Sequence, residues 1–408
     1  MPSQISITEA PTSQSQSWSQ DDLRTKFTYA LSEMYRSEVP LYGDLLKIVR
    51  NVDDSVLRQQ GLARRDLPVR HNLERHGAIR IGSDSEMRVI KRLFSVLGMQ
   101  PVGYYDLTVV DFPCTPPPSA PSRKIPYLLS AETRETVERV LEKRSLFTPR
   151  LLEILDQAEA SGGAVAPEDA DVFVTESLKI FKWHAQSTVS LDDYLKLKQE
   201  HPMIADIVCF PSAHINHLTP RTPRRRCPIL LRQTSFKALE EPVSFPSVAG
   251  GVTPGSHTAR FGEIEQRGAA VTRRGRDLYD ELLREVTAQN AESGASDDVE
   301  GFDRVLAKVF EAYPDDWDEL RRRAQGVLEC EPLTYEDFLP LSAAGIFKSN
   351  LGENVSQSPI READNSMSDL EDILGCKIMS QFDVYQKLEQ ESLDRCAKEL
   401  GLSQLLLE

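Results

Sequence analysis

The chain has 408 residues, of which 40% are hydrophobic and 27% are charged, and its formal net charge is −15. These values are ordinary for a soluble globular protein that is long enough for one large core or for two domains. The acidic balance disfavours a general nucleic-acid binder, because phosphate contacts need a basic face. No apolar run approaches the roughly 20 residues of a membrane-spanning helix, so we expect neither nucleic acid nor a membrane as partner.

The N-terminal residues 1–21 are rich in Ser, Gln and Thr. They lack the basic start and apolar core of a secretory signal, so we expect a disordered tail. The six cysteines are scattered and form no CxxC pair. This spacing favours reduced thiols in a cytoplasmic protein, with an organelle matrix as the alternative. The sequence leaves the oligomeric state open.

Residues 22–50 have helical periodicity that Pro40 interrupts. Six prolines between residues 113 and 126 exclude a helix or a central strand there. Beyond them, Ser130 is the first of several helix start signals in a segment that extends to residue 200. We interpret residues 127–200 as a helical layer that covers a sheet.

A strand–helix–strand unit is predicted between the first helices and the prolines. Polar and apolar residues alternate over 76–81, which indicates a half-buried strand. Ser83 or Asp84 is suited to begin the next helix, and Gly98 ends it. Residues 102–107 have the pattern of a second strand. We take this unit, about residues 70–112, as the first of two that carry candidate ligands.

Two residues of this unit point to chemistry. Residues four apart on a strand share a face, so His76 and Arg80 are expected to point the same way. Histidine is a common metal ligand, and arginine binds carboxylates through two parallel hydrogen bonds. The pair therefore implies a metal site with an anionic substrate.

The second candidate unit covers about residues 205–290. The pattern from Ala205 predicts a strand, and the segment after it contains His214 and His217. Both histidines could instead satisfy local hydrogen bonds or cap a turn. We also expect a buried strand at residues 229–231.

Two carboxylates lie on another strand-like segment of this unit, residues 261–267. Glu263 and Glu265 are two apart, so they face the same side of a strand. Taken alone, they would suit a solvated edge strand. A helix is expected over residues 272–286, followed by a polar loop over 288–299.

Two histidines and one carboxylate from separate strands form the ligand set of a facial triad. Such a set leaves positions open for substrate and dioxygen, which a closed structural zinc site does not. Zinc more often recruits cysteine, and the sequence offers no cysteine pair.

Six long segments match a known pattern: HGAIRIGSDSEM, GMQPVGYYDL, HINHLTPR, ILLRQTSFKALEEPV, RFGEIEQRGAAVT and FLPLSAAGIFKSNL. Together they resemble the 2-oxoadipate dioxygenase/decarboxylases, long catalogued as a domain of unknown function, from about Asp22 to Gly352. That family is related in fold to the vicinal-oxygen-chelate enzymes, including 4-hydroxyphenylpyruvate dioxygenase. The resemblance implies an α+β fold, in which a curved mixed β-sheet of vicinal-oxygen-chelate type surrounds a metal and helices pack outside.

The resemblance also implies an activity. Members of the family bind Fe(2+) and convert 2-oxoadipate and O2 into 2-hydroxyglutarate and CO2, a step of lysine catabolism. The expected partners are thus a small-molecule 2-oxo acid and O2. The resemblance implies one catalytic domain over residues 22–352, followed by a polar linker and a helical segment over 353–408.

Matching the family motifs onto this sequence implies His76, His217 and Glu263 as the metal ligands. His214 and Glu265 remain the alternatives for the second and third ligand. The match implies no catalytic group beyond the three ligands.

The expected substrate contacts come from His76, His217 and three further residues. Arg80 is implied as the clamp on the substrate carboxylate. Leu341 and Ser342 match a family segment near the bound oxoacid.

One departure from the family lies beside the second candidate ligand. Family members have a helix between the HLTPRT and CPILLRQ segments, but only Pro223–Arg226 separate them here. A helix needs roughly ten residues, so none fits. Two alternatives therefore stand beside the dioxygenase: a divalent-metal isomerase or hydrolase of the same superfamily, or a non-catalytic relative inactivated by a deletion.

Overall fold

The structure is a computed structural model. It describes the following residues: 18–38, 40–59, 61, 63, 78–104, 130–182, 184–200, 205, 208–210, 212–213, 232–235, 239–247, 250–259, 263–266, 268–292, 299–316, 334–335 and 364–403.

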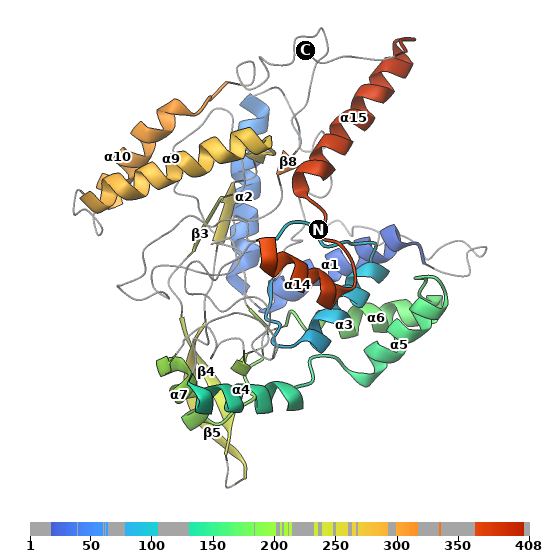
Figure 1. The fold of residues 1–408 in the computed structure, drawn as a ribbon, viewed down its shortest axis with the longest axis vertical. Coiled ribbons are helices and arrows are strands. Elements are labelled where there is room, and N and C mark those ends of the chain that lie inside the picture. Colours follow the sequence, from blue (N-terminus) through green and yellow to red (C-terminus); the bar gives the residue numbers. More distant parts are fainter. Residues whose placement is uncertain are drawn as a thin grey trace.

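The first hydrophobic core is made by helices from three separate parts of the sequence (Figure 1). They are α1 (Gln20–Glu38), α3 (Asp84–Val96), α5 (Pro149–Ala160), the 3-10 turn η4 (Pro167–Asp169) and α6 (Ala170–Leu178). Their apolar residues recur every three or four positions, so each helix buries one stripe. Leu93 of α3 and Leu97, which follows its end, are fully buried in this core.

The predicted break between the first two helices is confirmed. α1 ends at Glu38, and Pro40 is the first residue of α2 (Pro40–Gln59). Proline is well suited to a first helical position, where its missing N–H group has no intrahelical acceptor.

A second core lies where two helices meet a β-hairpin. The helices are α4 (Ala131–Lys143) and α7 (Leu191–Glu200), and the hairpin strands are β4 (Leu239–Pro246) and β5 (Val252–Ala259). The hairpin was not among the sequence predictions. Its signal is the pair Gly250-Gly251, whose φ angles of 89° and 84° lie in the left-handed region that glycine adopts readily.

The strand expected from Ala205 is wrong. Ala205, Val208 and Cys209 have helical backbone, and all three are fully buried. Their spacing of three and four residues is that of one helix face. The apolar run was read as a strand because periodicity alone does not separate a short buried helix from a buried strand.

The shorter strands among the described residues also form antiparallel pairs. They are β1 (Ala78–Ile79) with β2 (Ser212–Ala213), β3 (Arg232–Ser235) with β6 (Glu263–Gln266), and β7 (Gly268–Ala269) with β8 (Thr334–Tyr335). Helices and antiparallel strands together confirm the α+β class. The curved mixed sheet stays a prediction, and the strand expected at residues 229–231 lies outside the described residues.

Helices from the last third of the chain form a third cluster. They are α9 (Arg273–Glu292) and α10 (Val299–Val309), which continues as the 3-10 turn η5 (Phe310–Ala312). α9 confirms the helix expected over 272–286. It continues to Glu292, so the loop expected from residue 288 begins too early.

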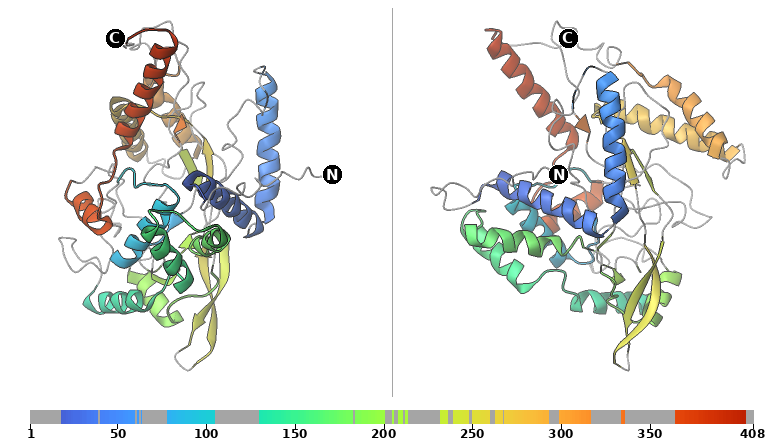
Figure 2. Two further views of the ribbon diagram at one scale, coloured as in Figure 1. Left: turned by 90° about the vertical axis from the view of Figure 1, so that its right-hand side faces the viewer. Right: turned by 180° about the vertical axis from the view of Figure 1, so that it is seen from behind.

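The C-terminal part contains α14 (Asp364–Leu374) and α15 (Gln381–Glu399). The β4–β5 hairpin lies at one end of the molecule, and α10 and α15 lie at the other (Figures 1 and 2). Among the helices of the described residues, none has the length and apolar composition that crossing a membrane requires.

Candidate active site

The predicted site is only partly contained in the described residues. Arg80 is described and half-buried. Glu263 and Glu265 are described as backbone of strand β6. The other predicted site residues, and the alternative second histidine, lie outside the described residues: His76, His214, His217, Leu341 and Ser342.

The β1–β2 pair brings together the two segments that lead to the predicted histidines. Ala78 pairs with Ala213, and Ile79 pairs with Ser212. In sequence, His76 precedes Ala78 by two residues, and His217 follows Ala213 by four. The two strands therefore meet at the ends from which the chain continues to both histidines.

The side chain of Arg80 contacts the segment that precedes β2. Its Nη1 donates a hydrogen bond to the backbone carbonyl oxygen of Phe210 at 3.3 Å. A guanidinium group has five N–H donors in a fixed plane. One fixed contact therefore restricts where the remaining donors can point.

The turn after Arg80 is held by a capping box. The Oγ of Ser83 accepts from the backbone N–H of Glu86 at 3.3 Å, and Glu86 Oε2 accepts from the backbone N–H of Ser83 at 3.2 Å. The Ser-x-x-Glu spacing is the sequence signature of this motif. Ser83 is thus confirmed as the N-cap of α3, and Gly98, with φ 69°, follows the end of the helix.

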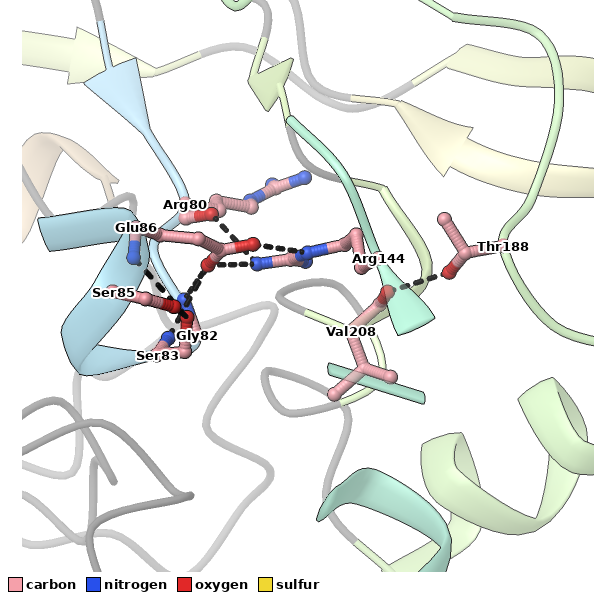
Figure 3. A network of polar contacts seen from close by, with 8 residues as sticks. All are labelled: Arg80, Gly82, Ser83, Ser85, Glu86, Arg144, Thr188 and Val208. Carbon is pink, nitrogen blue, oxygen red and sulfur yellow. Dashed lines mark hydrogen bonds and ion pairs between the residues drawn. The ribbon is translucent and has the colours of Figure 1, made fainter. Parts of the chain in front are cut away.

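The Glu86 carboxylate does more than close this box (Figure 3). Its Oε2 also accepts from the backbone N–H of Gly82 at 2.8 Å. Arg144 donates to both oxygens, from Nε to Oε1 at 2.8 Å and from Nη2 to Oε2 at 2.7 Å. The side chains of Arg144 and Glu86 are 2% and 7% exposed, so this is a buried ion pair.

Gly82 is required by the close approach of α4. A Cβ atom at this position would lie 2.4 Å from Leu141 Cδ2 and 2.9 Å from Arg144 Nη2. Both distances are shorter than real Cβ contacts, so any side chain would displace the ion pair or the core beside it.

Phe210 lies in a cluster of aromatic side chains. Its ring stacks on His257 with centroids 4.0 Å apart, and it meets the Tyr194 ring edge-on at 5.7 Å. The Tyr194 hydroxyl lies 3.0 Å from His257 Nδ1. His257 is 3% exposed, and Phe210 and Tyr194 are 1% exposed. The carbonyl that orients Arg80 thus belongs to a residue fixed by packing.

Val208 and Cys209, which precede Phe210 and have helical backbone, are anchored by Thr188 (Figure 3). Thr188 Oγ1 donates to the carbonyl oxygen of Val208 at 2.7 Å, and its backbone N–H donates to that of Cys209 at 3.3 Å. Carbonyl groups at a helix end have no partner within the helix. Thr188 supplies donors to both.

Sequence reasoning missed these supporting residues. The signal for Glu86 was present, because Ser83 and Glu86 match the capping-box spacing. Arg144 and Phe210 had no local signal, since Arg144 lies 58 residues from Glu86 and Phe210 lies 130 residues from Arg80.

The strand that carries the predicted carboxylate pairs with β3. In the register, Glu263 lies opposite Ser235, and Glu265 lies opposite Gln233. Within the described residues, no three His, Cys, Asp or Glu side chains gather closely enough to hold a metal ion. Since the predicted histidines are outside this set, the ligand assignment stays a prediction.

One further carboxylate holds a helix start. Glu176 of α6 accepts from Lys179 Nζ at 2.7 Å and from Oγ1 of Thr148 at 2.6 Å, and Thr148 is the N-cap of α5. The hydrogen bond from Lys179, with that from Thr148 second, lowers the pKa of Glu176 below its ordinary value. The charged form is therefore favoured in the folded state.

Comparison with known proteins gives the family. The family model described as 2-oxoadipate dioxygenase/decarboxylase matches residues 27–224 and 221–350. The chain belongs to this family. The resemblance expected from the sequence motifs is therefore confirmed, and the family is one of enzymes.

Two curated relatives carry the same description. The protein of Pseudomonas putida is 38% identical over 462 aligned positions, which cover 95% of this chain and 98% of the relative. The protein of Escherichia coli is 38% identical over 452 positions, which cover 92% of this chain and 98% of the relative.

Solved structures agree with the family in fold. The crystal structure of the hydroxyglutarate synthase from Pseudomonas putida in complex with 2-oxoadipate has a TM-score of 0.76 and 35% identity, covering 95% of this chain and all of that one. The crystal structure of an uncharacterized Shigella flexneri protein that includes domain DUF1338 has a TM-score of 0.72 and 32% identity. The match covers 94% of this chain and 100% of that one.

The alignment reveals positions that this chain lacks. It spans 462 positions, but 95% of 408 residues is only about 388, so about 74 positions of the alignment are gaps in this chain. The two matched segments overlap at residues 221–224, and this overlap includes the first two residues of the short link Pro223–Arg226. The division of the match thus coincides with the place where this chain is expected to lack a helix that family members have.

Proposed function

We propose that this chain is an Fe(2+)-dependent dioxygenase/decarboxylase that converts 2-oxoadipate and O2 into 2-hydroxyglutarate and CO2. The observation that carries the proposal is similarity over almost the whole chain to a family of this description, including a relative whose structure is in complex with 2-oxoadipate. Lysine catabolism is the metabolic context that the reaction suits.

The donor set fits iron. His76, His217 and Glu263 would hold the metal, and two imidazoles with one carboxylate leave positions open for substrate and dioxygen. The β1–β2 register supports this assignment, because the chain spans at most about 3.6 Å per residue. His76 and His217 are thus within a few residues of two paired backbone positions. Bound iron would supply the activation of dioxygen.

The chain itself would bind and orient the oxoacid. Arg80 would bind a substrate carboxylate bidentately, with its direction restricted by the Phe210 carbonyl. Leu341 and Ser342 would complete the pocket. The substrate is its own reductant. Its C1 carboxylate leaves as CO2, one oxygen atom of O2 joins the former keto carbon to make the new carboxylate, and the other forms the new hydroxyl group. No nicotinamide or flavin is required.

The finer architecture is part of the proposal. We infer a curved mixed sheet of vicinal-oxygen-chelate type that includes the β1–β2 and β3–β6 pairs, within a catalytic domain over residues 22–352. Cysteines kept as reduced thiols would suit a cytoplasmic protein, with an organelle matrix as the alternative.

An oxygen-electrode assay tests the function. Purified protein with Fe(2+) and 2-oxoadipate is expected to consume O2 and to release 2-hydroxyglutarate and CO2 in equal amounts, and a chelator is expected to stop it. Turnover without O2 would instead indicate an isomerase or hydrolase that uses the metal as a Lewis acid. Absence of bound iron and of oxygen uptake would indicate a non-catalytic relative.

Ligand variants refine the assay. His76→Ala, His217→Ala and Glu263→Ala are each expected to lose bound iron and oxygen uptake together. The matched controls His214→Ala and Glu265→Ala are expected to retain iron, measured by metal analysis of the purified variants. If His214→Ala loses iron and His217→Ala retains it, His214 is the ligand instead of His217. The same comparison decides between Glu265 and Glu263.

A further inference from the structure

The buried ion pair of Glu86 and Arg144 lies directly beside the backbone of Arg80 (Figure 3). A buried ion pair contributes little net stability compared with apolar side chains of similar volume, because both charges lose their hydration. Charge-assisted, bidentate hydrogen bonds do fix the geometry of the groups that they join. The contacts around this pair show that the backbone after Arg80 is among those groups.

Glu86 links the helix start to the residues that follow Arg80. Its carboxylate accepts from the backbone N–H groups of Gly82 at 2.8 Å and Ser83 at 3.2 Å. Arg144 orients this carboxylate through two parallel bonds of 2.8 and 2.7 Å. Arg144 Nη2 also lies 3.5 Å from the carbonyl oxygen of Arg80, at the long limit of a hydrogen bond. The backbone is thus fixed immediately after Arg80.

We propose that Glu86 and Arg144 are positioning residues that set the direction of the Arg80 side chain toward a substrate carboxylate. This inference rests on the proposed function, in which Arg80 binds the oxoacid. Arginine is long, so a small rotation of its backbone moves the guanidinium group by a much larger distance. Misplacement by about 1 Å can cost as much as a hundredfold in rate.

The decisive variant is Arg144→Lys, studied in two backgrounds. Lysine keeps the charge but lacks the planar fork, so it cannot hold both carboxylate oxygens. In the otherwise unchanged protein, we expect kcat/KM for 2-oxoadipate to fall about tenfold, and anaerobic binding of 2-oxoadipate, measured by calorimetry, to weaken by a similar factor. In the Arg80→Ala background, the same change is expected to alter both quantities less than about twofold.

The two backgrounds separate positioning from a general structural role. If Glu86 and Arg144 act through Arg80, their effect disappears once Arg80 is gone. A structural role would lower kcat/KM by the same factor with or without the Arg80 side chain. Equal factors in the two backgrounds overturn the proposal.

Arg92→Lys is the matched control, because Arg92 is on α3, the helix of Glu86, and also makes a paired contact. Its Nε donates to Glu159 at 2.7 Å, and its Nη2 bonds Asp156, so it joins α3 to α5 away from the turn. We expect its kcat/KM to match that of the unchanged protein. A loss equal to that of Arg144→Lys would overturn the proposal.

A second variant covers the case in which Arg144→Lys does not fold. The double change Glu86→Gln with Arg144→Gln removes both charges together and leaves no charge unpaired. The folded double variant is expected to show the same loss, again abolished by Arg80→Ala, and unaltered kinetics would overturn the proposal.

Failure of the proposed function is distinguishable from failure of the positioning role. If the unchanged protein does not consume O2 with 2-oxoadipate, the proposed function fails. The Kd for 2-oxoadipate, measured by calorimetry, can still be compared among the unchanged protein, Arg144→Lys, Arg80→Ala and the double variant. If Arg144→Lys weakens binding equally with and without Arg80, the positioning role is overturned. It is also overturned if the unchanged protein does not bind 2-oxoadipate.

Discussion

Arg80 is supported from two regions, the turn at Gly82–Ser83 and the aromatic cluster around Phe210. The turn uses directional bonds to one buried carboxylate, whose geometry allows little adjustment. The cluster uses packed rings, which hold a backbone carbonyl in place without bonding to it. Both regions restrict Arg80, but by different means. We therefore expect changes in the turn to act through directional bonds, and changes in the cluster to act mainly through the stability of the packing.

The largest expected effect concerns the aromatic region. Phe210→Ala leaves a cavity among fully buried rings, and we expect it to lower the free energy of unfolding by about 3–5 kcal/mol. Denaturant unfolding measures this loss. Phe210→Leu, which keeps most of the volume, is the control and is expected to cost under about 1.5 kcal/mol. Equal losses for the two variants would contradict the role of packing in this cluster.

A smaller effect is expected from the turn. Gly82→Ala forces a methyl group against Leu141 and Arg144, and overpacking of this kind costs about 1–3 kcal/mol. Leu141 contributes the atom nearest to the added methyl group. The loss of stability caused by Gly82→Ala should therefore be smaller in a Leu141→Ala background, which a double-mutant cycle measures.

Gly275→Ala, in the first turn of α9, is the matched control for this change. A Cβ atom there meets nothing nearer than 3.1 Å, and alanine favours a helix. The control is expected to cost less than Gly82→Ala. Equal costs would show that close approach at Gly82 is not what limits the position.

The smallest effect is expected at Glu176, a carboxylate that holds a helix start without a buried arginine. Its folded-state pKa is lowered by Lys179 and Thr148, so its contribution is complete above the ordinary glutamate pKa of about 4.3. The contribution is lost as the pH falls through the lowered value. Glu176→Gln should therefore lower Tm at pH 7, by an amount worth under about 1 kcal/mol.

The pH dependence checks this expectation. Thermal unfolding of Glu176→Gln and of the unchanged protein should converge as the pH falls below the ordinary glutamate range. A difference in Tm that persisted unchanged into strong acid would contradict an ionic contribution from Glu176.

Much of the local structure followed from sequence signals. Pro40, Ser83 and Gly98 mark helix boundaries through backbone geometry that each residue type favours, and the structure has them there. The α+β class was implied by the resemblance to the family, and the structure confirms it. Ala205, Val208 and Cys209, which have helical backbone, were expected in a strand because a short apolar run suits either a buried strand or a buried helix.

The site was less predictable than the fold. The position of Arg80 beside the β1–β2 pair could be anticipated from alternation and from family motifs. Its partner Phe210 and the ion-pair partner Arg144 could not, because tertiary packing brings them together from distant segments. No spacing rule within one element specifies such contacts.

The separation of these contacts along the chain has a consequence for synthesis on the ribosome. Ser83 and Glu86 are made within a few residues of Arg80, so the cap can form early. Phe210 follows Arg80 by 130 residues, which takes roughly 6 to 26 s at 5–20 residues per second. Throughout that interval the residues of the cap have been made, but the carbonyl that restricts the arginine side chain has not.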